Sequence, residues 1–340
     1  MIPKKLLRGS LVIAAVAVLS LSMAACTQEK NPDATSSSGA QATGDHSNET
    51  YYWISQNSTL PLFVANDYPG WKSAAKQLGV KEKMVGPTTI DLSGFIATID
   101  QVCAQHPAGV SVVGWDPSLS ASVDKCIAAG VPVVTDDADL PNSKRLAFIG
   151  TNWYQIGVEQ AKAMIAATKP GKVATLSIIA ADNMTQARAG FAATLKGSGF
   201  TIVANEDDAG SAETAAAKTA SLLAAYPDLV GIAGFDSESG AGIVRALTEG
   251  GKAGKIAVTA MEQTPEFFKT VKEGTVSAII IQKRSLFTYY ALRTLYDYNH
   301  NGQTIDGLTA KQASPVPANI DTGLLVANKG NIDKILAAQK

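Results

Sequence analysis

The sequence predicts an α/β protein with two doubly wound lobes, each built on a parallel sheet. From residue 51 onward, short apolar runs alternate with stretches of helical periodicity. The apolar runs are nearly continuous, which is typical of strands that helices cover on both faces. Many helical stretches end at glycine, the residue that best tolerates a left-handed C-cap. Since a chain of 340 residues exceeds the size of a single core, two lobes are expected.

The first 25 residues (1–25) are expected to be a signal peptide. Three basic residues lie within the first eight positions, an apolar run follows at residues 11–19, and small residues lead to Cys26. The apolar run is too short to cross a bilayer, which requires about 20 residues. We therefore expect the protein to be exported across the cytoplasmic membrane.

Cys26 directly follows Ala24 and Ala25, an arrangement that resembles the lipobox of bacterial lipoproteins, whose cysteine receives a diacylglycerol. Met23 stands where that motif usually has leucine. Lipidation of Cys26 would anchor the protein to the periplasmic or extracellular face of the cell envelope. The alternative is ordinary cleavage, which leaves Cys26 as a free or removed thiol.

Residues 26–50 are expected to be the lipidated cysteine and a disordered tether. Residues 27–50 contain no large apolar side chain and cannot support a core. A flexible segment of this length spans about 25 to 30 Å, which would hold the folded body clear of the lipid headgroups. His46 lies in this segment and is expected to be inert.

Five apolar runs are the expected strands of the first lobe. Gly79 and Gly130 close helices between them. Right-handed crossovers in a 2-1-3-4-5 strand order connect the runs. They lie at residues 51–55, 82–85, 110–114, 131–135 and 146–150.

Five further runs are the expected strands of the second lobe, and Gly250 and Gly274 close helices there. No short sequence repeat relates the two halves, so any similarity between them is architectural. The runs lie at residues 172–179, 201–205, 229–235, 256–260 and 277–281. The helix between the two series is indicated by apolar and small residues at helical spacing, namely Tyr154, Val158, Ala161 and Ile165.

The expected topology brings two cysteines near each other. The helices at about residues 91–105 and 120–129 fall side by side on one face of the first sheet. Cys103 and Cys126 each lie two or three residues before the end of their helix. A disulfide is geometrically feasible in an oxidising compartment, and two buried thiols are the open alternative.

Charge and composition exclude several classes of partner. Removal of residues 1–25 leaves 26 basic and 30 acidic residues, a net charge of −4. A nucleic-acid binder would show a basic patch or stripe, so no nucleic-acid partner is expected. The same balance does not support polybasic adhesion to membranes, so membrane contact is expected through the lipid only.

No catalytic centre is expected. None of the three histidines has a metal-ligand neighbour at useful spacing, and the GxSxG, HExxH and CxxC motifs do not occur. The stretch GGKAGKI at residues 250–256 resembles a phosphate loop only superficially, since Glu249 stands in place of the first glycine. We therefore expect no catalytic residue, no metal and no cofactor, and the protein is not expected to be an enzyme.

Four segments together resemble the type I periplasmic binding proteins of sugar ABC transporters, the class with ribose, galactose, xylose and autoinducer receptors. The resemblance covers about residues 51–340. Its most specific segments are AGVPVVTDDADL (129–140), IGTNWYQIG (149–157), RAGF (188–191) and VRALTEGGKAGKIAVTAMEQTPEFFKTVKEGTVSAIIIQKR (244–284).

The resemblance implies two lobes joined by three crossovers, with a ligand held in the cleft between them. The crossovers are expected near Thr151, Gln282 and Asp321. The N-terminal lobe would then comprise residues 51–151 plus 283–320. The C-terminal lobe would comprise residues 152–282 plus 321–340.

The expected ligand contacts are polar and aromatic side chains that follow strands or lie at the hinge. Open parallel sheets bind ligands at the carboxyl ends of their strands. Acids and amides can bridge sugar hydroxyls, and aromatic rings can cover the flat C–H faces of a sugar. The residues are Asn57, Phe63, Trp115, Asp136, Asp137, Asn152, Arg188, Phe235, Asp236, Glu262 and Gln282.

Each assignment has a purely structural alternative. The three aromatic residues are also compatible with a core position, and the three aspartates with capping of helices or turns. Arg188 is compatible with a solvated helix surface. Gln282 and Asn152 are compatible with a role in fixing the hinge.

Departures from the family pattern bear on the ligand. Leu60 precedes Pro61 where many members have asparagine, Ala138 replaces the arginine that follows the strand-four aspartate in ribose receptors, and Glu262 stands for their second-lobe aspartate. Arg188 lies three residues before Phe191 instead of four. Ribose is therefore not carried over. A cleft rich in acids with one arginine favours a neutral sugar, and an amino sugar or another cation is the alternative.

The expected function is capture of a monosaccharide or related polyol by a monomeric, lipid-anchored receptor that delivers it to an ABC permease. A sugar-sensing receptor for a chemoreceptor or sensor kinase is the alternative, because the same closed form could dock on either.

Overall fold

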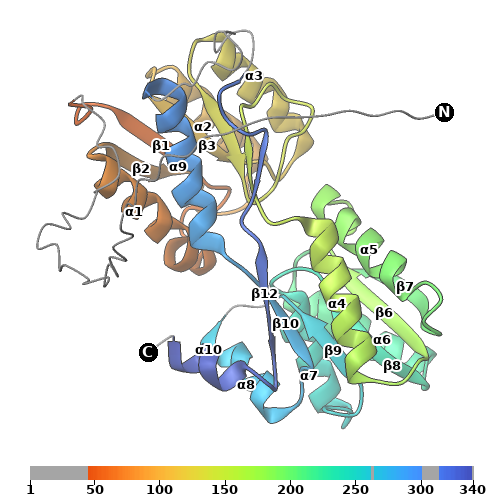
Figure 1. The fold of residues 1–340 in the computed structure, drawn as a ribbon. Helices are drawn as coiled ribbons and strands as arrows, with labels where there is room; N and C mark the ends of the chain where they lie inside the picture. The colour runs from red at the N-terminus through yellow and green to blue at the C-terminus, as the bar shows by residue number, and fades with distance from the viewer. Residues whose placement is uncertain (1–44, 262–263, 301–313, 339–340) are drawn as a thin grey trace, which may run out of the picture. The chain divides into compact units, whose positions relative to one another are not determined.

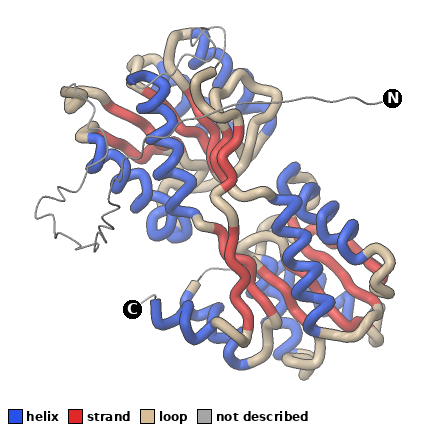
Figure 2. The backbone as a smooth tube through the Cα atoms, viewed as in Figure 1, coloured by secondary structure: helices blue, strands red, loops and turns tan. Residues whose placement is uncertain are grey.

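The computed structural model describes residues 45–261, 264–300 and 314–338, and it confirms the predicted fold class. The described chain forms two six-stranded sheets, each with helices packed on both faces (Figures 1 and 2). Within these ranges, no helix combines the length and the apolar character needed to cross a bilayer.

The first sheet has the strand order β11-β5-β4-β3-β1-β2, and its strand pairs are parallel. Its strands are β1 (Thr50–Ile54), β2 (Lys81–Val85), β3 (Gly109–Val113), β4 (Val133–Asp136), β5 (Phe148–Gly150) and β11 (Asn319–Asp321). Its helices are η1 (Phe63–Asp67), α1 (Tyr68–Leu78), α2 (Leu92–Cys103), η2 (Pro117–Leu119), α3 (Ser120–Ala128) and α9 (Arg284–His300).

The alternation of side chains along β1 explains why this strand is apolar throughout. Tyr51 and Trp53 pack against residues of α1 and α9 on one face of the sheet. Tyr52 and Ile54 pack against residues of α2 and α3 on the other face. Successive residues of a strand point to opposite faces, so a strand covered by helices on both sides needs apolar residues at every position.

The second sheet has the strand order β12-β10-β9-β8-β6-β7. Its strands are β6 (Lys172–Ser177), β7 (Thr201–Asp207), β8 (Leu229–Gly234), β9 (Ala257–Ala260), β10 (Ala278–Gln282) and β12 (Leu324–Asn328). Its helices are α4 (Trp153–Ala167), α5 (Asp182–Leu195), α6 (Ala212–Ala225), α7 (Ser239–Glu249), α8 (Pro265–Glu273) and α10 (Ile332–Ala338).

Helices α4 and α5 pack closely because each presents a glycine to the other. A Cβ at Gly157 would lie 1.8 Å from the carbonyl oxygen of Ala187, and a Cβ at Gly190 would lie 2.0 Å from that of Tyr154. Neither position has room for a side chain. The glycine of the RAGF segment is therefore explained by helix packing.

The structure confirms the ten expected strands and the 2-1-3-4-5 order of the first lobe, with small shifts at strand ends. β4 begins at Val133 instead of residue 131, and the intervening Pro132 has no N–H to donate to a ladder. The strands β11 and β12 were not expected. β12 pairs antiparallel with β10, the one antiparallel pair among the described strands.

The chain passes between the two sheets three times. It leaves the first sheet after β5, returns after β10 by entering α9, and leaves again between β11 and β12. The short segment between β11 and β12 contains Thr322, whose N–H and hydroxyl both donate to the carbonyl oxygen of Gly150 at 2.9 and 3.2 Å. Two of the crossing segments are therefore hydrogen-bonded to each other.

Cys103 and Cys126 form a disulfide between α2 and α3, with their Cα atoms 5.4 Å apart. The two helices lie side by side on one face of the first sheet. Both cysteines belong to the apolar cluster on that face, so the bridge lies within the core.

The end of the segment expected to be a tether is part of the folded body. Thr50 begins β1, and the Glu49 carboxylate accepts hydrogen bonds from Tyr51 and His300. The His46 ring packs on His300. The tether was expected to extend to residue 50 and to contain an inert His46, and the division of the chain into tether and lobes stays a prediction. Residues 1–44, including Cys26, lie outside the described residues.

Candidate functional site

Arg284, the first residue of α9, lies between two carboxylates at the carboxyl edge of the first sheet. Its Nε donates to Asp67 Oδ2 at 2.9 Å. Its Nη1 and Nη2 donate to the two oxygens of Asp137 at 3.0 and 2.9 Å. The side chain of Arg284 is 5% exposed and that of Asp67 is fully buried. This chain of ion pairs joins segments that are more than 140 residues apart in sequence.

Asp137 is the residue of this chain of ion pairs that solvent can reach. Its side chain is 14% exposed, and it directly follows the last residue of β4. The backbone adopts a left-handed conformation with φ of 62°, which aspartate tolerates better than most residues. The N–H of Asp137 donates to the carbonyl oxygen of Ile149 at 3.1 Å. The bidentate contact with Arg284 therefore fixes a partly exposed carboxylate at the sheet edge.

Burial raises the pKa of two carboxyl groups at this sheet edge, one within the chain of ion pairs and one beside it. The pKa of Asp67 rises to about 7 because the group is buried, although the charge of Arg284 opposes the shift. The pKa of Asp136 rises to about 8, again through burial, although a hydrogen bond from Ser111 opposes it. A neutral Asp136 is therefore the major form at pH 7.

Asp136 and Phe235, both predicted as ligand contacts, lie in the core, and their contact with a ligand stays a prediction. Asp136 has no exposed surface, and it accepts hydrogen bonds from Ser111 Oγ at 2.7 Å and from Trp53 Nε1 at 3.1 Å. Phe235 also has no exposed surface and packs edge-on against Phe191. Both residues lie beneath the sheet edge and support it.

Phe63 and Trp115 line different parts of the first lobe. Phe63 is 2% exposed and packs edge-on against Trp53, and the guanidinium of Arg284 lies 5.3 Å from the centre of the Phe63 ring. Trp115 is partly exposed and contacts Phe95. Phe63 thus supports the ion-pair chain from below, and Trp115 presents part of its ring to the surface.

Arg188 on α5 binds the edge of the second sheet. Its Nη1 donates to Ser177 Oγ at 2.6 Å, and its Nη2 donates to the carbonyl oxygen of Ile179 at 3.0 Å and to Thr185 Oγ1 at 2.9 Å. Burial lowers the pKa of Arg188, and the nearby Asp207 opposes this shift. Both terminal nitrogens of Arg188 therefore donate hydrogen bonds that order the loop after β6.

Asp208 and Asp236 form an acid pair at the carboxyl ends of β7 and β8. Asp236 Oδ1 accepts hydrogen bonds from the N–H groups of Glu238 and Ser239, and Oδ2 is buried without a hydrogen-bond donor. Asp208 accepts a hydrogen bond from Ser239 Oγ at 2.5 Å. Burial raises the pKa of Asp208 to about 7, and the neighbouring charge of Asp236 raises it further. The protonated and ionised forms of Asp208 are therefore both well populated near neutral pH.

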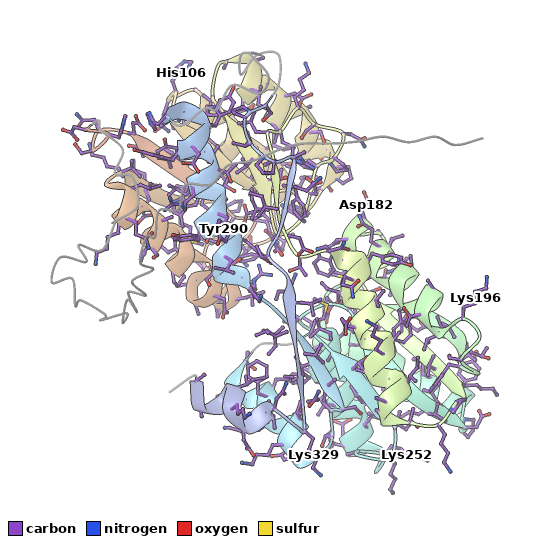
Figure 3. All side chains as sticks on the ribbon, in the orientation of Figure 1. His106, Asp182, Lys196, Lys252, Tyr290 and Lys329 are labelled. Carbon is purple, nitrogen blue, oxygen red and sulfur yellow. A yellow bond between two sulfur atoms is a disulfide. The ribbon has the colours of Figure 1, made fainter. Side chains whose placement is uncertain are left out.

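A cavity of about 590 Å³ lies beside Trp115 and the segment after β5. Polar residues of α4 and α5 contribute to its lining, including Asn152, Asp182, which Figure 3 labels at the start of α5, and Gln186. Trp115 Nε1 and the hydroxyl of Thr151 are buried and make no hydrogen bond with other described residues. The cavity is therefore lined by an aromatic ring, several hydrogen-bonding groups and two polar groups that lack partners.

The predicted residues do not all come together at this cavity. Trp115 and Asn152 line it, whereas Asp137 lies one residue before its lining residues 138 and 139. Asn152 also caps α4 by accepting a hydrogen bond from the Gln155 N–H at 3.1 Å.

The remaining predicted residues have local or hinge contacts, or are not described. Asn57 accepts hydrogen bonds from the N–H and hydroxyl of Thr59 and so orders the turn after β1. Gln282 ends β10, and its Oε1 accepts a hydrogen bond from Arg284 Nη1 at 3.3 Å. Glu262 lies outside the described residues.

Sequence reasoning missed Arg284, Asp67 and Asp208. Arg284 follows the hinge residue Gln282 closely and lies within the segment 244–284, and this position was a usable indication. Asp67 is separated from Arg284 by 217 residues, so no sequence spacing predicts their contact. The structure therefore adds a second arginine to a site that was expected to contain one.

The two sheets, each with helices on both faces, and the three crossing segments form the fold of a type I periplasmic binding protein. Residues 51–303 match the periplasmic binding protein domain, and the chain belongs to this family. The predicted family is therefore confirmed. The family is extracytoplasmic. No curated protein matches the sequence.

Three similar solved structures extend the comparison to most of the chain. A sugar-binding protein of a sugar ABC transporter from Bacillus halodurans is 27% identical, with a TM-score of 0.77, and the match covers 84% of this chain and 99% of that one. AraP, an arabinose-binding protein from Geobacillus stearothermophilus, is 27% identical with a TM-score of 0.75, and covers the same shares. An ABC transporter solute-binding protein from Burkholderia graminis in complex with D-arabinose is 25% identical with a TM-score of 0.75, covering 85% of this chain and 98% of that one.

Proposed function

We propose that the protein is an extracytoplasmic receptor that captures a neutral monosaccharide or related polyol and delivers it to an ABC permease. The observation that supports this most directly is the cavity beside Trp115, where the indole Nε1 of Trp115 and the hydroxyl of Thr151 have no hydrogen-bond partner among the residues that the structure describes. A buried polar group without a partner costs about 1 to 3 kcal/mol, so a ligand that pairs with it gains affinity.

The charge distribution of the sheet edges favours a neutral ligand. Arg284 is compensated by Asp67 and Asp137, and both terminal nitrogens of Arg188 are engaged by neutral oxygens. A phosphate or carboxylate ligand would need a cation that is free to pair with it. Sugar hydroxyls both donate and accept hydrogen bonds, and they suit a site whose charges are already balanced.

The acid pair supports a second candidate, an amino sugar. Asp236 Oδ2 is buried without a donor, and the neighbouring Asp208 carries a pKa raised to about 7, chiefly by burial. An ammonium group placed beside the pair would donate to this oxygen and favour the ionised form of Asp208. This arrangement would select a cation over a neutral hydroxyl.

Transport requires that the permease distinguish loaded from empty receptor. We infer that the N-terminal lobe (51–151 plus 283–320) and the C-terminal lobe (152–282 plus 321–340) close about the ligand through the three crossing segments. A ligand that touches both lobes shifts the equilibrium by its differential affinity for the closed form. This function needs no covalent chemistry, so the protein is proposed not to be an enzyme. The alternative of a sensing receptor uses the same closed form.

The proposed location is the outer face of the cytoplasmic membrane or the periplasm, with a lipid anchor on Cys26 and the protein acting as a monomer. The basis is the sequence of residues 1–26. Detergent partitioning of the mature protein tests the anchor: a lipidated chain enters the detergent phase, and recovery in the aqueous phase would contradict the proposal.

Titration calorimetry with D-arabinose, D-galactose, glucosamine and arabinose 5-phosphate tests the ligand class. We expect binding of a neutral sugar and none of the phosphate. Trp115→Phe removes the unpaired indole N–H and keeps a ring, and it should weaken binding by about fivefold. Trp71→Phe is the matched control, because Trp71 Nε1 is also buried without a partner among the described residues, but Trp71 belongs to α1 and lies in the core.

Two outcomes would contradict the ligand assignment. Tight binding of the sugar phosphate without binding of the neutral sugars would show that the charge argument is wrong. Equal loss of affinity in the two tryptophan variants would show that Trp115 does not contact the ligand. Preference for glucosamine that is lost in Asp236→Asn would favour the amino-sugar candidate.

A further inference from the structure

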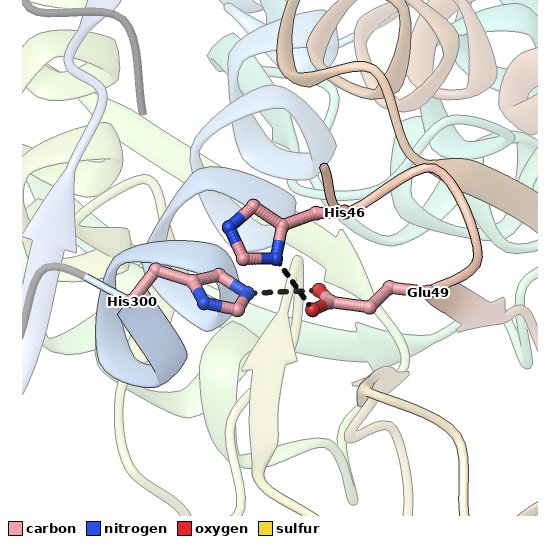
Figure 4. Close-up of side chains that lie close together, drawn as sticks. All are labelled: His46, Glu49 and His300. Carbon is pink, nitrogen blue, oxygen red and sulfur yellow. Dashed lines mark hydrogen bonds and ion pairs between the residues drawn. The ribbon is translucent and has the colours of Figure 1, made fainter. Parts of the chain in front are cut away.

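His46, Glu49 and His300 form a cluster at the far end of the first lobe from the hinge segment that enters α9. His46 Nδ1 lies 2.9 Å from Glu49 Oε1, and His300 Nε2 lies 2.8 Å from Glu49 Oε2 (Figure 4). One nitrogen of each ring and one carboxylate oxygen all lie within 4.8 Å of one another. The three side chains therefore direct metal-ligating atoms toward a common point.

The cluster is built from two segments that are distant in sequence. His46 and Glu49 belong to a turn closed by a hydrogen bond from the Glu49 N–H to the His46 carbonyl oxygen at 2.9 Å, directly before β1. His300 is the last residue of α9. The two imidazole rings have centroids 3.7 Å apart, and the Tyr296 ring packs on both of them. All three side chains of the cluster are partly buried.

A second layer of residues orients the carboxylate. Tyr51 donates its hydroxyl hydrogen to Glu49 Oε2 at 2.9 Å. Asn299 Nδ2 in turn donates to the Tyr51 oxygen at 3.1 Å and to the carbonyl oxygen of Ala108 at 2.8 Å. Partners of this kind, which hold a ligand in place without touching the ion, are typical of metal sites.

We propose that His46, Glu49 and His300 bind one divalent cation of the Zn²⁺ type. Two imidazole nitrogens and one carboxylate oxygen are a common three-ligand set for zinc, with a fourth position left to water. Bonds of about 2.0 to 2.2 Å to a tetrahedral ion place ligand atoms about 3.3 Å apart. The observed nitrogen-to-oxygen distances of 2.8 and 2.9 Å therefore need only a small outward adjustment.

Access and charge also support an ion at this position. Glu49 and His300 line a surface cavity of about 720 Å³, which gives an ion and its bound water a path from solvent. Without an ion, both stacked imidazoles must direct a hydrogen at the same carboxylate. With an ion bound, each ring instead turns a nitrogen lone pair toward the ion. The bound ion would join the entry of β1 to the end of α9 and so stabilise the first lobe.

Calorimetric titration of the full chain with ZnCl₂, in a Cys26→Ser background that removes the thiol outside the described residues, tests the site. We expect one Zn²⁺ per chain and a rise in the melting temperature that EDTA reverses. His46→Gln and His300→Gln should each lower the affinity by at least tenfold. The third histidine, His106, which Figure 3 labels, is exposed and lines the same cavity but is not a member of the cluster, so His106→Gln is the matched control and should leave the zinc affinity unchanged.

Tyr51→Phe separates the metal site from a simple hydrogen-bonded clamp. It keeps the buried ring of Tyr51 and removes only the hydroxyl that orients Glu49, and it should weaken zinc binding by about tenfold. His46 lies in a peripheral turn, so its replacement should leave the fold and sugar affinity unchanged. The proposal is overturned if the wild-type chain binds no Zn²⁺, or if zinc affinity is the same in His46→Gln, His300→Gln and wild type.

Discussion

Replacement of Arg284 by methionine tests the ion-pair chain at the edge of the first sheet. The guanidinium donates one hydrogen bond to Asp67, two to Asp137 and one to Gln282. Methionine keeps much of the apolar stem of the side chain and removes all four donors. The two carboxylates are then left without their cation, one of them with no exposed surface at all.

The expected loss of stability is about 3 to 5 kcal/mol, since removal of one partner of a buried ion pair leaves an uncompensated charge. The pKa of Asp67 is already raised to about 7 by burial, and the charge of Arg284 is what holds it down. In Arg284→Met this pKa rises further, and Asp67 becomes protonated at pH 7. Protonation relieves the buried charge and places the expected loss near 3 kcal/mol.

Urea unfolding at pH 7, followed by tryptophan fluorescence, measures this loss as a lower midpoint at unchanged slope. Asp137→Asn is the comparison variant, because it removes a partly exposed partner and leaves Arg284 paired with Asp67. It should cost about 1 to 2 kcal/mol. If Arg284→Met lowered the free energy of unfolding by less than 1 kcal/mol, or by less than Asp137→Asn does, the ion pairs of Arg284 would not be the stabilising element described above.

Three further experiments, two of them on variants, test the core of each lobe. Burial raises the pKa of Asp136 from 3.8 to about 8, so the folded protein holds this proton more tightly than the unfolded chain and loses stability as the pH rises from about 4 to 8. Urea unfolding of Asp136→Asn at pH 4 and pH 8 should show a smaller loss of stability between these values than wild type. An equal loss in the variant and wild type would contradict the raised pKa of Asp136. The denatured, unreduced protein should yield no free thiol from Cys103 or Cys126, and reduction should cost about 3 kcal/mol of stability; recovery of both thiols would exclude the bridge. Gly157→Ala should lower stability by about 3 kcal/mol in thermal unfolding, since its Cβ would lie 1.8 Å from a backbone oxygen, and a wild-type melting temperature would show that α4 and α5 can separate without cost.

The fold could be predicted from sequence wherever burial alone determined the residue type. β3 is buried at every position, and its apolar run identifies it without ambiguity. β12 differs, because only Ala327 among its five residues is buried and Leu325 is half exposed. Its partial exposure gives neither a continuous apolar run nor a clean alternation, so hydrophobic pattern does not mark it as a strand.

The sequence predicted the position of the candidate site better than it predicted which residues form the site. Asp136 and Asp137 are adjacent at the end of β4, and sequence places both at the sheet edge. Only the structure shows that the residue within the strand is buried beneath Trp53, whereas the next one turns outward through a left-handed backbone conformation. The two aspartates differ in exposure because their side chains point in different directions. Two identical adjacent residues give no sign of this difference in the sequence.

The ion-pair chain also connects ligand contact with the crossing segment that follows β10. Arg284 begins α9 two residues after the end of β10, and the same guanidinium contacts Gln282 and holds Asp137. If the ligand binds at Asp137, as proposed, a hydrogen bond that it donates to this carboxylate would weaken the pairing of Asp137 with Arg284. Because Asp67 also holds Arg284, its side chain would not be free to rotate in response. Occupancy at the sheet edge would then be transmitted to the residue at which the chain returns to the first lobe.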